Sequence, residues 1–473
     1  MFSFLIPKDR QLFKYIFILA TPVIISNTSR VLMGIVDLIM IGHLGASAIA
    51  AVGIAGMVSW TFISLGIAFR TGTQSFVARR LGEKQYAKCS TALQNMLLLS
   101  FVIGVPITII ACCYIDSIMS LFISKTNNIK AFNLSIDYAY YNFLSLFFLY
   151  ASFVFQGFFT GIEKTKIHMK VVIASNLLNF YLNAGLIFGS NQIEEFLSPT
   201  IFSFLSILWV PFNFPELGVK GAAIGTLVAT IWSCIHYLYY LFNKDIINKY
   251  QVFKYQINKD MLKRQLIIAY PLAIQEFLVM LSLTIFYKII AFIGIVQLAA
   301  TQIIFKIMHA SFMPAIGVGQ ACATLVGKSL GEGNPDKAEL SINESLRGSL
   351  YIMGSVGLCF ILFAEYIIPL FVKEHEVIAL AVPGLRFIGF LQIIDAYCFT
   401  LWFALTGAGD TKIPAIFDII NHWLVFVPLC YFLGIYCGYG YWGAWFSFGI
   451  MLVFIAIFMF IRFKSGNWKN IKV

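Results

Sequence analysis

Apolar segments long enough to cross a membrane recur along this 473-residue chain and constrain its fold more than any other feature. A helix needs roughly 20 residues to cross a hydrocarbon core of about 30 Å, and a helix satisfies its own backbone hydrogen bonds there. We therefore predict an all-α polytopic membrane protein with twelve transmembrane helices. The expected spans are 13–42, 47–78, 89–112, 131–158, 167–190, 219–242, 261–293, 296–327, 338–363, 377–406, 413–435 and 440–462.

Composition excludes several other classes of protein. Apolar residues make up 60% of the chain and charged residues 12%, against about 25% charged residues in an ordinary soluble domain. The net charge of +11 does not predict a nucleic-acid partner, because the basic residues are spread over short loops instead of forming one patch. The nine cysteines show no metal-type spacing, so we expect no bound zinc, no disulfide framework and no cofactor.

The basic loop residues predict how the chain is oriented. With the N-terminus inside, 23 Lys and Arg residues lie on the cytoplasmic side, and only Lys125, Lys130, Lys220 and Lys373 lie outside. By the positive-inside rule both termini are then cytoplasmic. The proline-containing segment 191–217 becomes a long external connection that can rest on the membrane surface.

The two halves of the chain repeat each other. Pro22 corresponds to Pro271, Gly45 to Gly294 and Leu81-Gly82-Glu83 to Leu330-Gly331-Glu332, all at a shift of 249 residues. Six spans per half give both repeats the same orientation, so they should be related by an axis along the membrane normal, with a cavity between them. We predict two pseudo-symmetric lobes, 1–243 (helices 1–6) and 265–473 (helices 7–12, the seventh starting near 261), joined by a basic cytoplasmic linker at 244–264.

Two charges inside the first apolar segment mark a candidate site. Arg30 and Asp37 lie on one face of the expected helix with Gly34 between them. Charged groups are expensive in a membrane and normally face a bundle interior or a wet cavity, so Asp37 is a candidate functional residue. The alternative is that Asp37 and Arg30 only neutralise each other or a neighbouring helix.

Several motifs resemble those of one transporter family. They are Pro22 with GIVDLIMIGHLG (34–45), ARRLGE (78–83) with its partner GKSLGE (327–332), NFYLNAGLIFG (179–189), SFMPAIGVGQACATLVG (311–327) and TGAGDTKIP (406–414). In their order and spacing they resemble the MATE (multidrug and toxic compound extrusion) family of bacterial type, over essentially the whole chain. This resemblance implies a V-shaped antiporter that expels organic compounds in exchange for H⁺ or Na⁺.

The resemblance also suggests site residues. Asp37 matches the first-helix Asp that the family uses in cation coupling, Asn179 matches an Asn of the same cavity, and Asn183 stands where some H⁺-coupled members carry Asp. Asp395 matches a tenth-helix Asp, so Na⁺ at Asp37 or Asp395 stays open. The seventh-helix acid of the family would fall near 279, whereas the acid present here is Glu276, which puts Na⁺ binding in the second lobe in doubt.

The residues themselves leave other roles open. Asn179 and Asn183, four apart, can line a cavity or hold helices together, and Met33 and Gln74 are weaker cavity candidates. Asp395 and Glu276 can titrate, bind a cation or pair with a basic residue. The basic residues and histidines considered as charge partners are Arg30, Lys288, Lys306, Arg386 and His309, and an internal salt bridge is the favoured role for Lys306. Asp418 and His422, also four apart, are treated in the same way.

These observations favour transport over catalysis. No nucleophile–base or metalloprotease motif is present in the sequence, so we expect no enzyme. We predict a monomeric secondary antiporter of the bacterial inner membrane that exports amphiphilic, cationic organic compounds by alternating access, driven by H⁺ rather than Na⁺. The alternative function is a flippase for a lipid-linked precursor, which belongs to the same superfamily.

Overall fold

Helices fill almost the whole of the described chain. The computed structural model describes residues 6–123, 129–254 and 257–471, so the predicted loop positions Lys125 and Lys472 lie outside the described residues. Within these ranges twelve helical spans are long and apolar enough to cross a membrane, which confirms the predicted fold class. They are α1 (Arg10–Gly42), α2 with α3 (Ala46–Leu65, Ile67–Gly82), α4 (Tyr86–Cys113), α6 (Ile129–Gly161), α7 (Thr165–Leu197), α8 (Val219–Leu241), α10 (Lys259–Ile293), α11 (Ile295–Gly331), α12 with η4 (Pro335–Ile367, Ile368–Leu370), α13 (His375–Ala408), α14 to η6 (Lys412–Tyr436) and α16 (Gly440–Lys464).

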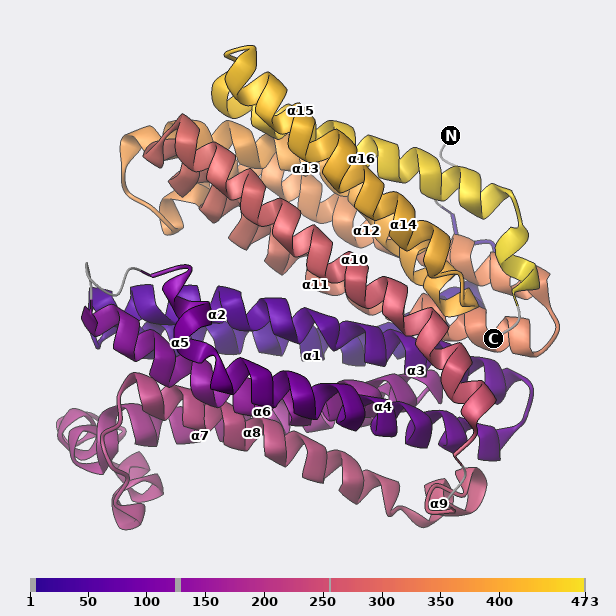
Figure 1. Cartoon of the computed structure of the whole chain (residues 1–473), viewed down its shortest axis with the longest axis horizontal. Helices are drawn as coiled ribbons and strands as arrows, with labels where there is room; N and C mark the ends of the chain where they lie inside the picture. The colour runs from indigo at the N-terminus through magenta and orange to yellow at the C-terminus, as the bar shows by residue number, and fades with distance from the viewer. Residues whose placement is uncertain (1–5, 124–128, 255–256, 472–473) are drawn as a thin grey trace.

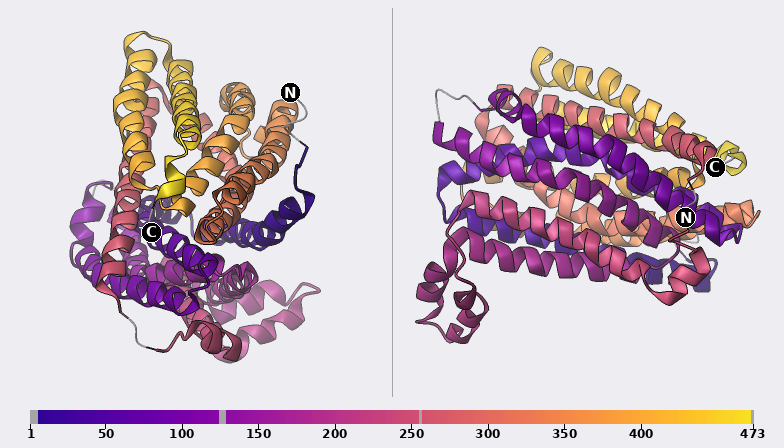
Figure 2. Two further views of the ribbon diagram at one scale, coloured as in Figure 1. Left: turned by 90° about the vertical axis from the view of Figure 1, so that its right-hand side faces the viewer. Right: turned by 60° about the horizontal axis from the view of Figure 1, so that its bottom comes forward.

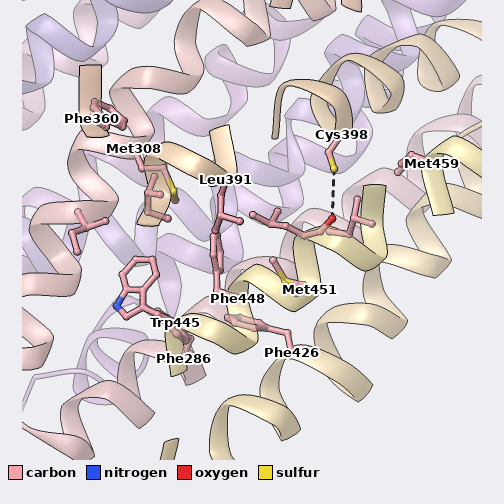
Figure 3. Close-up of a cluster of buried hydrophobic side chains, with 14 of the residues drawn as sticks. Phe286, Met308, Phe360, Leu391, Cys398, Phe426, Trp445, Phe448, Met451 and Met459 are labelled. Atoms are coloured by element: carbon pink, nitrogen blue, oxygen red, sulfur yellow. Dashed lines mark hydrogen bonds between the residues drawn. The ribbon is translucent and has the colours of Figure 1, made fainter. Parts of the chain in front are cut away.

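The spans form two lobes, an N-lobe of α1 to α8 and a C-lobe of α10 to α16 (Figure 1). Each lobe has its own large buried apolar cluster. Part of the C-lobe cluster is shown in Figure 3, where Phe286, Phe426, Trp445 and Phe448 lie together. The lobes converge at the end that carries α9 (Lys244–Tyr250) and both described chain ends (Figure 1). We call this end the linker side and the opposite end the far side.

The first helix of each lobe also packs against the other lobe (Figure 2). On α1, Ile16, Leu19 and Ala20 are buried against Val318 and Ala321 of α11. On α10, four buried apolar residues join the cluster of the N-lobe: Met261, Ile268, Ala269 and Leu272. The helices cross at equivalent places, because Pro22 lies just after the α1 contacts and Pro271 lies among the last of the α10 contacts. The N-lobe core therefore includes residues of α10, and α1 forms a smaller apolar cluster with α11 of the C-lobe.

Backbone contacts between α3 and α11 close the linker side. A Cβ atom at Gly82 would lie 2.0 Å from the carbonyl oxygen of Lys328, and one at Gly331 would lie 2.2 Å from the carbonyl oxygen of Arg79. Glycine is therefore required at both positions for the two helices to touch. These are the two repeated Leu-Gly-Glu sequences, so the repeat itself builds a symmetric contact between the lobes.

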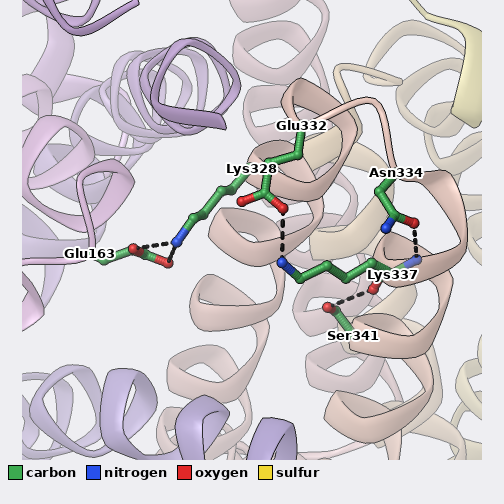
Figure 4. A network of polar contacts seen from close by, with 6 residues as sticks. All are labelled: Glu163, Lys328, Glu332, Asn334, Lys337 and Ser341. Atoms are coloured by element: carbon green, nitrogen blue, oxygen red, sulfur yellow. Dashed lines mark hydrogen bonds and ion pairs between the residues drawn. The ribbon is translucent and has the colours of Figure 1, made fainter. Parts of the chain in front are cut away.

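Polar contacts reinforce this closure. Gln74 donates to the carbonyl of Gln320 at 2.7 Å and to the hydroxyl of Thr324 at 2.8 Å. Lys328 forms an ion pair with Glu163 at 2.8 Å (Figure 4). The hydrogen bonds that join α1–α8 to α10–α16 in the described chain all come from linker-side parts of the helices. The structure is thus sealed on the linker side.

The predicted external connection at 191–217 forms a folded cap on the far side. Gly189 takes a φ of +76° inside α7, and this bends the chain so that 190–197 leaves the helix axis. Two short helices follow, η2 (Ser203–Leu208) and η3 (Val210–Phe212), and the indole of Trp209 donates to the carbonyl of Tyr181 at 2.8 Å. Large apolar side chains are exposed on the cap, namely Phe196, Ile201, Phe202, Phe204, Ile207 and Phe212. Such an apolar surface suits a segment that lies on a membrane.

We predict that Gly82→Ala and Gly331→Ala each weaken the linker-side closure. The added methyl group must push two backbones apart, which costs about 1–3 kcal/mol, equivalent to roughly a 5- to 150-fold change in the closed population. The measurement is the alkylation rate of a cysteine introduced by Ser329→Cys, a buried position next to Lys328 of this contact, in a cysteine-free background.

Gly354→Ala is the matched control, because a Cβ atom there meets nothing within 4 Å. Its alkylation rate should equal that of the parent protein. Equal rates for the Gly82, Gly331 and Gly354 variants would contradict the assigned role of the two glycines.

Candidate functional site

Asp37 lies in a chain of polar side chains from three N-lobe helices. Asn183 of α7 donates to the Asp37 carboxylate at 2.8 Å. Asn183 and Asn179 exchange hydrogen bonds at 3.3 and 3.4 Å, and Asn179 donates to Thr226 of α8 at 3.4 Å. Both asparagines are buried, while Asp37 is partly exposed. The structure therefore brings together three residues that the sequence analysis selected, in a position where the carboxylate is reachable and hydrogen-bonded.

The sequence of α1 explains why Asp37 faces inward. Exposed apolar residues recur every seven positions at Ile18, Ile25, Leu32 and Ile39, which marks the lipid-facing stripe. Successive residues turn by about 100° around a helix, so Asp37, two residues before Ile39, lies on the opposite side. The space beside it is open, because a Cβ atom at Gly34 would meet nothing within 4 Å.

Arg30 lies on the inward face of α1 but does not pair with Asp37. Arg30 is two residues before Leu32, so it also points away from the lipid stripe, and its side chain is exposed. Neither Arg30 nor Asp37 makes an ion pair with another described residue. The alternative in which these two charges simply neutralise each other is therefore wrong.

A second polar cluster lies in the C-lobe. Gln275 of α10 donates to Asp418 of α14 (Lys412–Ile420) at 2.6 Å, and His422 lies 3.2 Å from the other carboxylate oxygen of Asp418. Glu276 is in electrostatic range of Asp418 and His422 and also of Arg70 on α3 of the N-lobe. His422 stands in a π-helical turn (Asn421–Phe426), a feature often found at functional positions. Glu276 thus belongs to a charged group that spans both lobes.

Asp395 stands apart from these clusters. It is 2% exposed on α13, and its Oδ2 atom has no hydrogen-bond partner among the described residues. Arg386, considered as its partner, instead pairs with Glu365 at 2.8 Å. A buried carboxyl group without a cationic neighbour is stable only as the neutral acid or with a bound ion, so Asp395 stays a candidate for ion binding.

Several other predicted roles need correction. Gln74 is buried in the closure between the lobes and so does not line a cavity in this structure. Lys306, Lys288 and His309 make no ion pair with a described residue, so the salt bridge favoured for Lys306 is wrong. Lys306 and His309 are exposed on α11. Ile295, at the start of the helix, is the one large apolar side chain of α11 that is exposed. The exposed face of α11 therefore suits contact with water rather than with lipid.

Lys288 and Met33 are placed by the helix geometry alone. Lys288 follows Ile274 and Leu281 at seven-residue spacing, so it continues the lipid-facing stripe of α10 close to the helix end at Ile293. There its ammonium group can reach the membrane surface. Met33 is partly exposed and lies one turn after Arg30, on the inward side of α1.

Sequence reasoning missed the roles of three residues, Gly225, Thr226 and Arg70. Gly225 of α8 packs on Asn183, since a Cβ atom at Gly225 would lie 2.0 Å from the Asn183 Oδ1 atom. Thr226 then completes the polar chain. Arg70 of α3 lies within electrostatic range of Arg30 and Glu276, which its position in an apolar span does not indicate. The adjacent Gly225 and Thr226 in an apolar helix are the one sequence signal that could have located this packing.

A groove on the outer face of α1 is separate from these clusters. It has a volume of about 450 Å³ and is lined by Lys14, Phe17, Ile18, Thr21, Pro22, Ile25, Lys166 and Met169. Ile18 and Ile25 belong to the lipid-facing stripe, so the groove opens toward the membrane and not toward Asp37.

Known proteins resemble this chain over nearly its whole length. A protein-family model described as MatE matches residues 22–184 and 271–432. The "Probable multidrug resistance protein NorM" of Thermotoga maritima is 25% identical over 479 residues, covering 99% of this chain and 96% of that protein. The "Multidrug resistance protein NorM" of Vibrio cholerae is 26% identical over 420 residues, covering 88% and 86%.

Solved structures share the fold. A crystal structure of MATE in the straight conformation superposes with a TM-score of 0.84 at 22% identity, covering 97% of each chain. An outward-facing conformation of a multidrug resistance MATE family transporter of the MOP superfamily superposes with a TM-score of 0.83 at 22% identity, again over 97% of each chain.

We predict that Gly225→Ala disrupts the polar chain by displacing Asn183. The methyl group would overlap the Asn183 amide, so the free energy of unfolding should fall by about 1–3 kcal/mol. In an Asn183→Ala background the same change should cost less than about 1 kcal/mol, because the overlapping amide is absent. Chemical denaturation of the four proteins measures this coupling. Gly53→Ala, where a Cβ atom meets nothing within 4 Å, is the control, and a zero coupling energy would refute the packing.

Proposed function

The chain belongs to the MatE family, and from this membership we propose that it is a secondary active antiporter that exports amphiphilic organic compounds in exchange for H⁺. It is a multi-pass membrane protein of the multidrug efflux class. Two of its relatives are named for multidrug resistance. Ion coupling and substrate charge are the parts that we propose.

The observation that carries the proposal is the state of Asp37. Its carboxylate accepts a hydrogen bond from Asn183, has no cationic partner within pairing distance among the described residues, and faces the open space at Gly34. A partly exposed carboxylate that is hydrogen-bonded to a neutral amide suits a group that takes up and releases a proton.

Proton coupling follows if a cationic group and a proton compete for Asp37. The carboxylate can pair with the positive end of an amphiphile while the surrounding apolar surface contacts the remainder of the molecule. Protonation removes the negative charge and so weakens the hold on the substrate. A proton entering the cell down a pH gradient of one unit releases about 1.4 kcal/mol, which can drive export of a singly charged cation, because this one-for-one exchange moves no net charge across the membrane.

The surroundings of the acids favour H⁺ over Na⁺. Sodium needs several oxygen ligands around an ionised carboxylate, but Asn183 presents its NH₂ group to Asp37, and the amide oxygens of Asn179 and Asn183 each accept a hydrogen bond from the other asparagine. Glu276 has Arg70 as well as Asp418 and His422 in its electrostatic range, and the arginine opposes a bound cation there.

We propose that transport alternates between two arrangements of the lobes. The linker side is assigned to the cytoplasm of a bacterium, with both termini there and the protein a monomer in the inner membrane, on the strength of the positive-inside rule. The structure, sealed on the linker side, then corresponds to an outward-facing state. Rocking of 1–243 against 265–473 would open the α3–α11 contact and expose Asp37 to the cytoplasm.

We predict that Asp37→Asn keeps the protein folded but abolishes export driven by a pH gradient. Without a titratable group the proton no longer competes with the substrate, and the accumulation ratio should fall by about tenfold for each pH unit of the imposed gradient. The measurement is dye transport into vesicles with an imposed gradient, repeated with a sodium gradient to identify the ion. Asp116→Asn, an exposed carboxylate on α5 (Ile115–Ser120), is the control.

Export at the parent rate by the Asp37→Asn protein would place coupling elsewhere, with Asp395 and Glu276 the next residues to change. Stimulation by a sodium gradient alone would reject the proton.

A further inference from the structure

We propose that Arg30 and Arg70 form an anion-binding subsite on the N-lobe side of the space between the lobes, and that the exported amphiphile carries a carboxylate or a similar anionic group. The inference rests on the proposed export function and names the charge class of its substrate. A molecule that suits both Asp37 and this subsite is a zwitterionic amphiphile.

The first element of the subsite is the exposed guanidinium group of Arg30. Arg30 lies in the membrane-spanning part of α1, on the side opposite the lipid-facing stripe that includes Ile25 and Leu32. Exposure on that side means that the side chain faces the space between helices and not the lipid. It makes no hydrogen bond or ion pair with another described residue.

The second element is Arg70, which reaches the same region from α3. Arg70 and Arg30 lie within electrostatic range of each other. The Nε atom of Arg70 is buried and has no hydrogen-bond partner among the described residues. Glu276 is the acid in its electrostatic range, but it lies beyond ion-pair distance and also interacts with His422.

Among the described residues, no carboxylate other than Glu276 is in electrostatic range of this pair. His168 of α7 lies near both guanidinium groups, but it is fully buried and bonded through Nδ1 to the Tyr237 hydroxyl at 2.6 Å. Tyr237 of α8 is likewise buried. Two neighbouring cations therefore share at most one acid, which leaves an excess of positive charge inside the membrane.

Such an excess is expensive unless a ligand compensates it. An intramembrane charge normally pairs with another charge or lines a functional pathway, and two like charges at short range raise the cost further. A carboxylate or phosphate group offers several acceptor oxygens in the planar geometry that guanidinium groups bind in pairs of hydrogen bonds. An anionic group on the substrate would compensate the positive charge and reduce the repulsion between the two arginines.

The other basic residues within spans do not share this property. Arg347 pairs with Glu344, Arg386 pairs with Glu365, and Lys288 lies on the lipid-facing stripe near a helix end. Lys306 is exposed on α11 and so belongs to the C-lobe. The unpaired positive charge of the N-lobe is therefore concentrated at Arg30 and Arg70.

The subsite is compatible with proton coupling at Asp37. Arg30 and Asp37 are seven residues apart on one face of α1, about 10 Å along the helix axis. One molecule can place a cationic group near Asp37 and an anionic group near Arg30. A proton then competes with the cationic end alone, while the anionic group adds affinity and selects the substrate.

The test uses a rhodamine dye that carries a free carboxylate and the methyl ester of the same dye, which is purely cationic. Binding of each dye is measured at equilibrium with the full chain in nanodiscs, and transport is measured in vesicles. Arg30→Gln and Arg70→Gln should each weaken binding of the carboxylate dye by about 10- to 100-fold, the range for a hydrogen bond to a charged group, and change binding of the ester by less than about threefold.

Arg386→Gln is the matched control, because that arginine is paired with Glu365 away from the subsite, and it should leave both dyes unaffected. Arg30→Lys keeps the charge and should retain most of the preference for the carboxylate. Since Arg30 is exposed, its variants decide the test even if Arg70→Gln does not fold.

A third arm separates a soluble substrate from a lipid. Nanodiscs with and without an anionic phospholipid show whether a lipid headgroup competes for the subsite, and a fluorescent anionic lipid tests flipping directly. Equal binding of the two dyes by the parent protein, or unchanged carboxylate binding in the Gln variants, overturns the inference. Arginine-dependent binding without transport of either dye would instead reject the proposed export function while the subsite stands.

Discussion

The contact between the α3 and α11 backbones is the interaction on which the rest of the structure depends. Side chains larger than hydrogen at Gly82 or Gly331 would separate the helices, because the facing carbonyl oxygens lie 2.0 and 2.2 Å from the positions of a Cβ atom. The seal that they allow brings Arg70 of α3 toward Glu276 of α10. Away from the seal, the inward faces of α1 and α11 remain accessible at Arg30 and Lys306. The close approach of α3 and α11 on the linker side thus determines which charged side chains stay accessible between the lobes.

Much of the fold could be predicted from the sequence because hydropathy and the repeat report on it directly. Apolar length locates the twelve spans to within several residues, and the shift of 249 residues relates the two halves. The exchange of α1 and α10 between the lobes could not be predicted, because it depends on which helices meet at the linker side. The bend at Gly189 was also missed, since a glycine in an apolar run is compatible with a straight helix.

The candidate site could be predicted from the sequence where the helical spacing alone places residues on one face of a helix. The four-residue spacing placed Asn179 and Asn183 on one face, and the structure brings that face to Asp37. The period does not say which helix lies opposite, so Gln74 was assigned to a cavity although it lies between the lobes. For the same reason Lys306 was given a salt bridge that it does not make, and the neighbourhood of Arg70 and Glu276 went unrecognised. Ion coupling by these residues stays a prediction.

The exchange of first helices makes folding and conformational change parts of one cooperative system. Ile268 and Leu272 of α10 complete the N-lobe core, and Ile16 and Leu19 of α1 pack on the C-lobe. Neither lobe can lose its partner without exposing apolar surface to a poorly matched environment, so the two lobes should not unfold independently. A change in the angle between the lobes must therefore bend these two helices. They should bend most easily at Pro22 and Pro271, because a backbone hydrogen bond is already missing there. The protein is thus better described as two interlocked bodies with paired internal hinges than as two blocks joined by a linker.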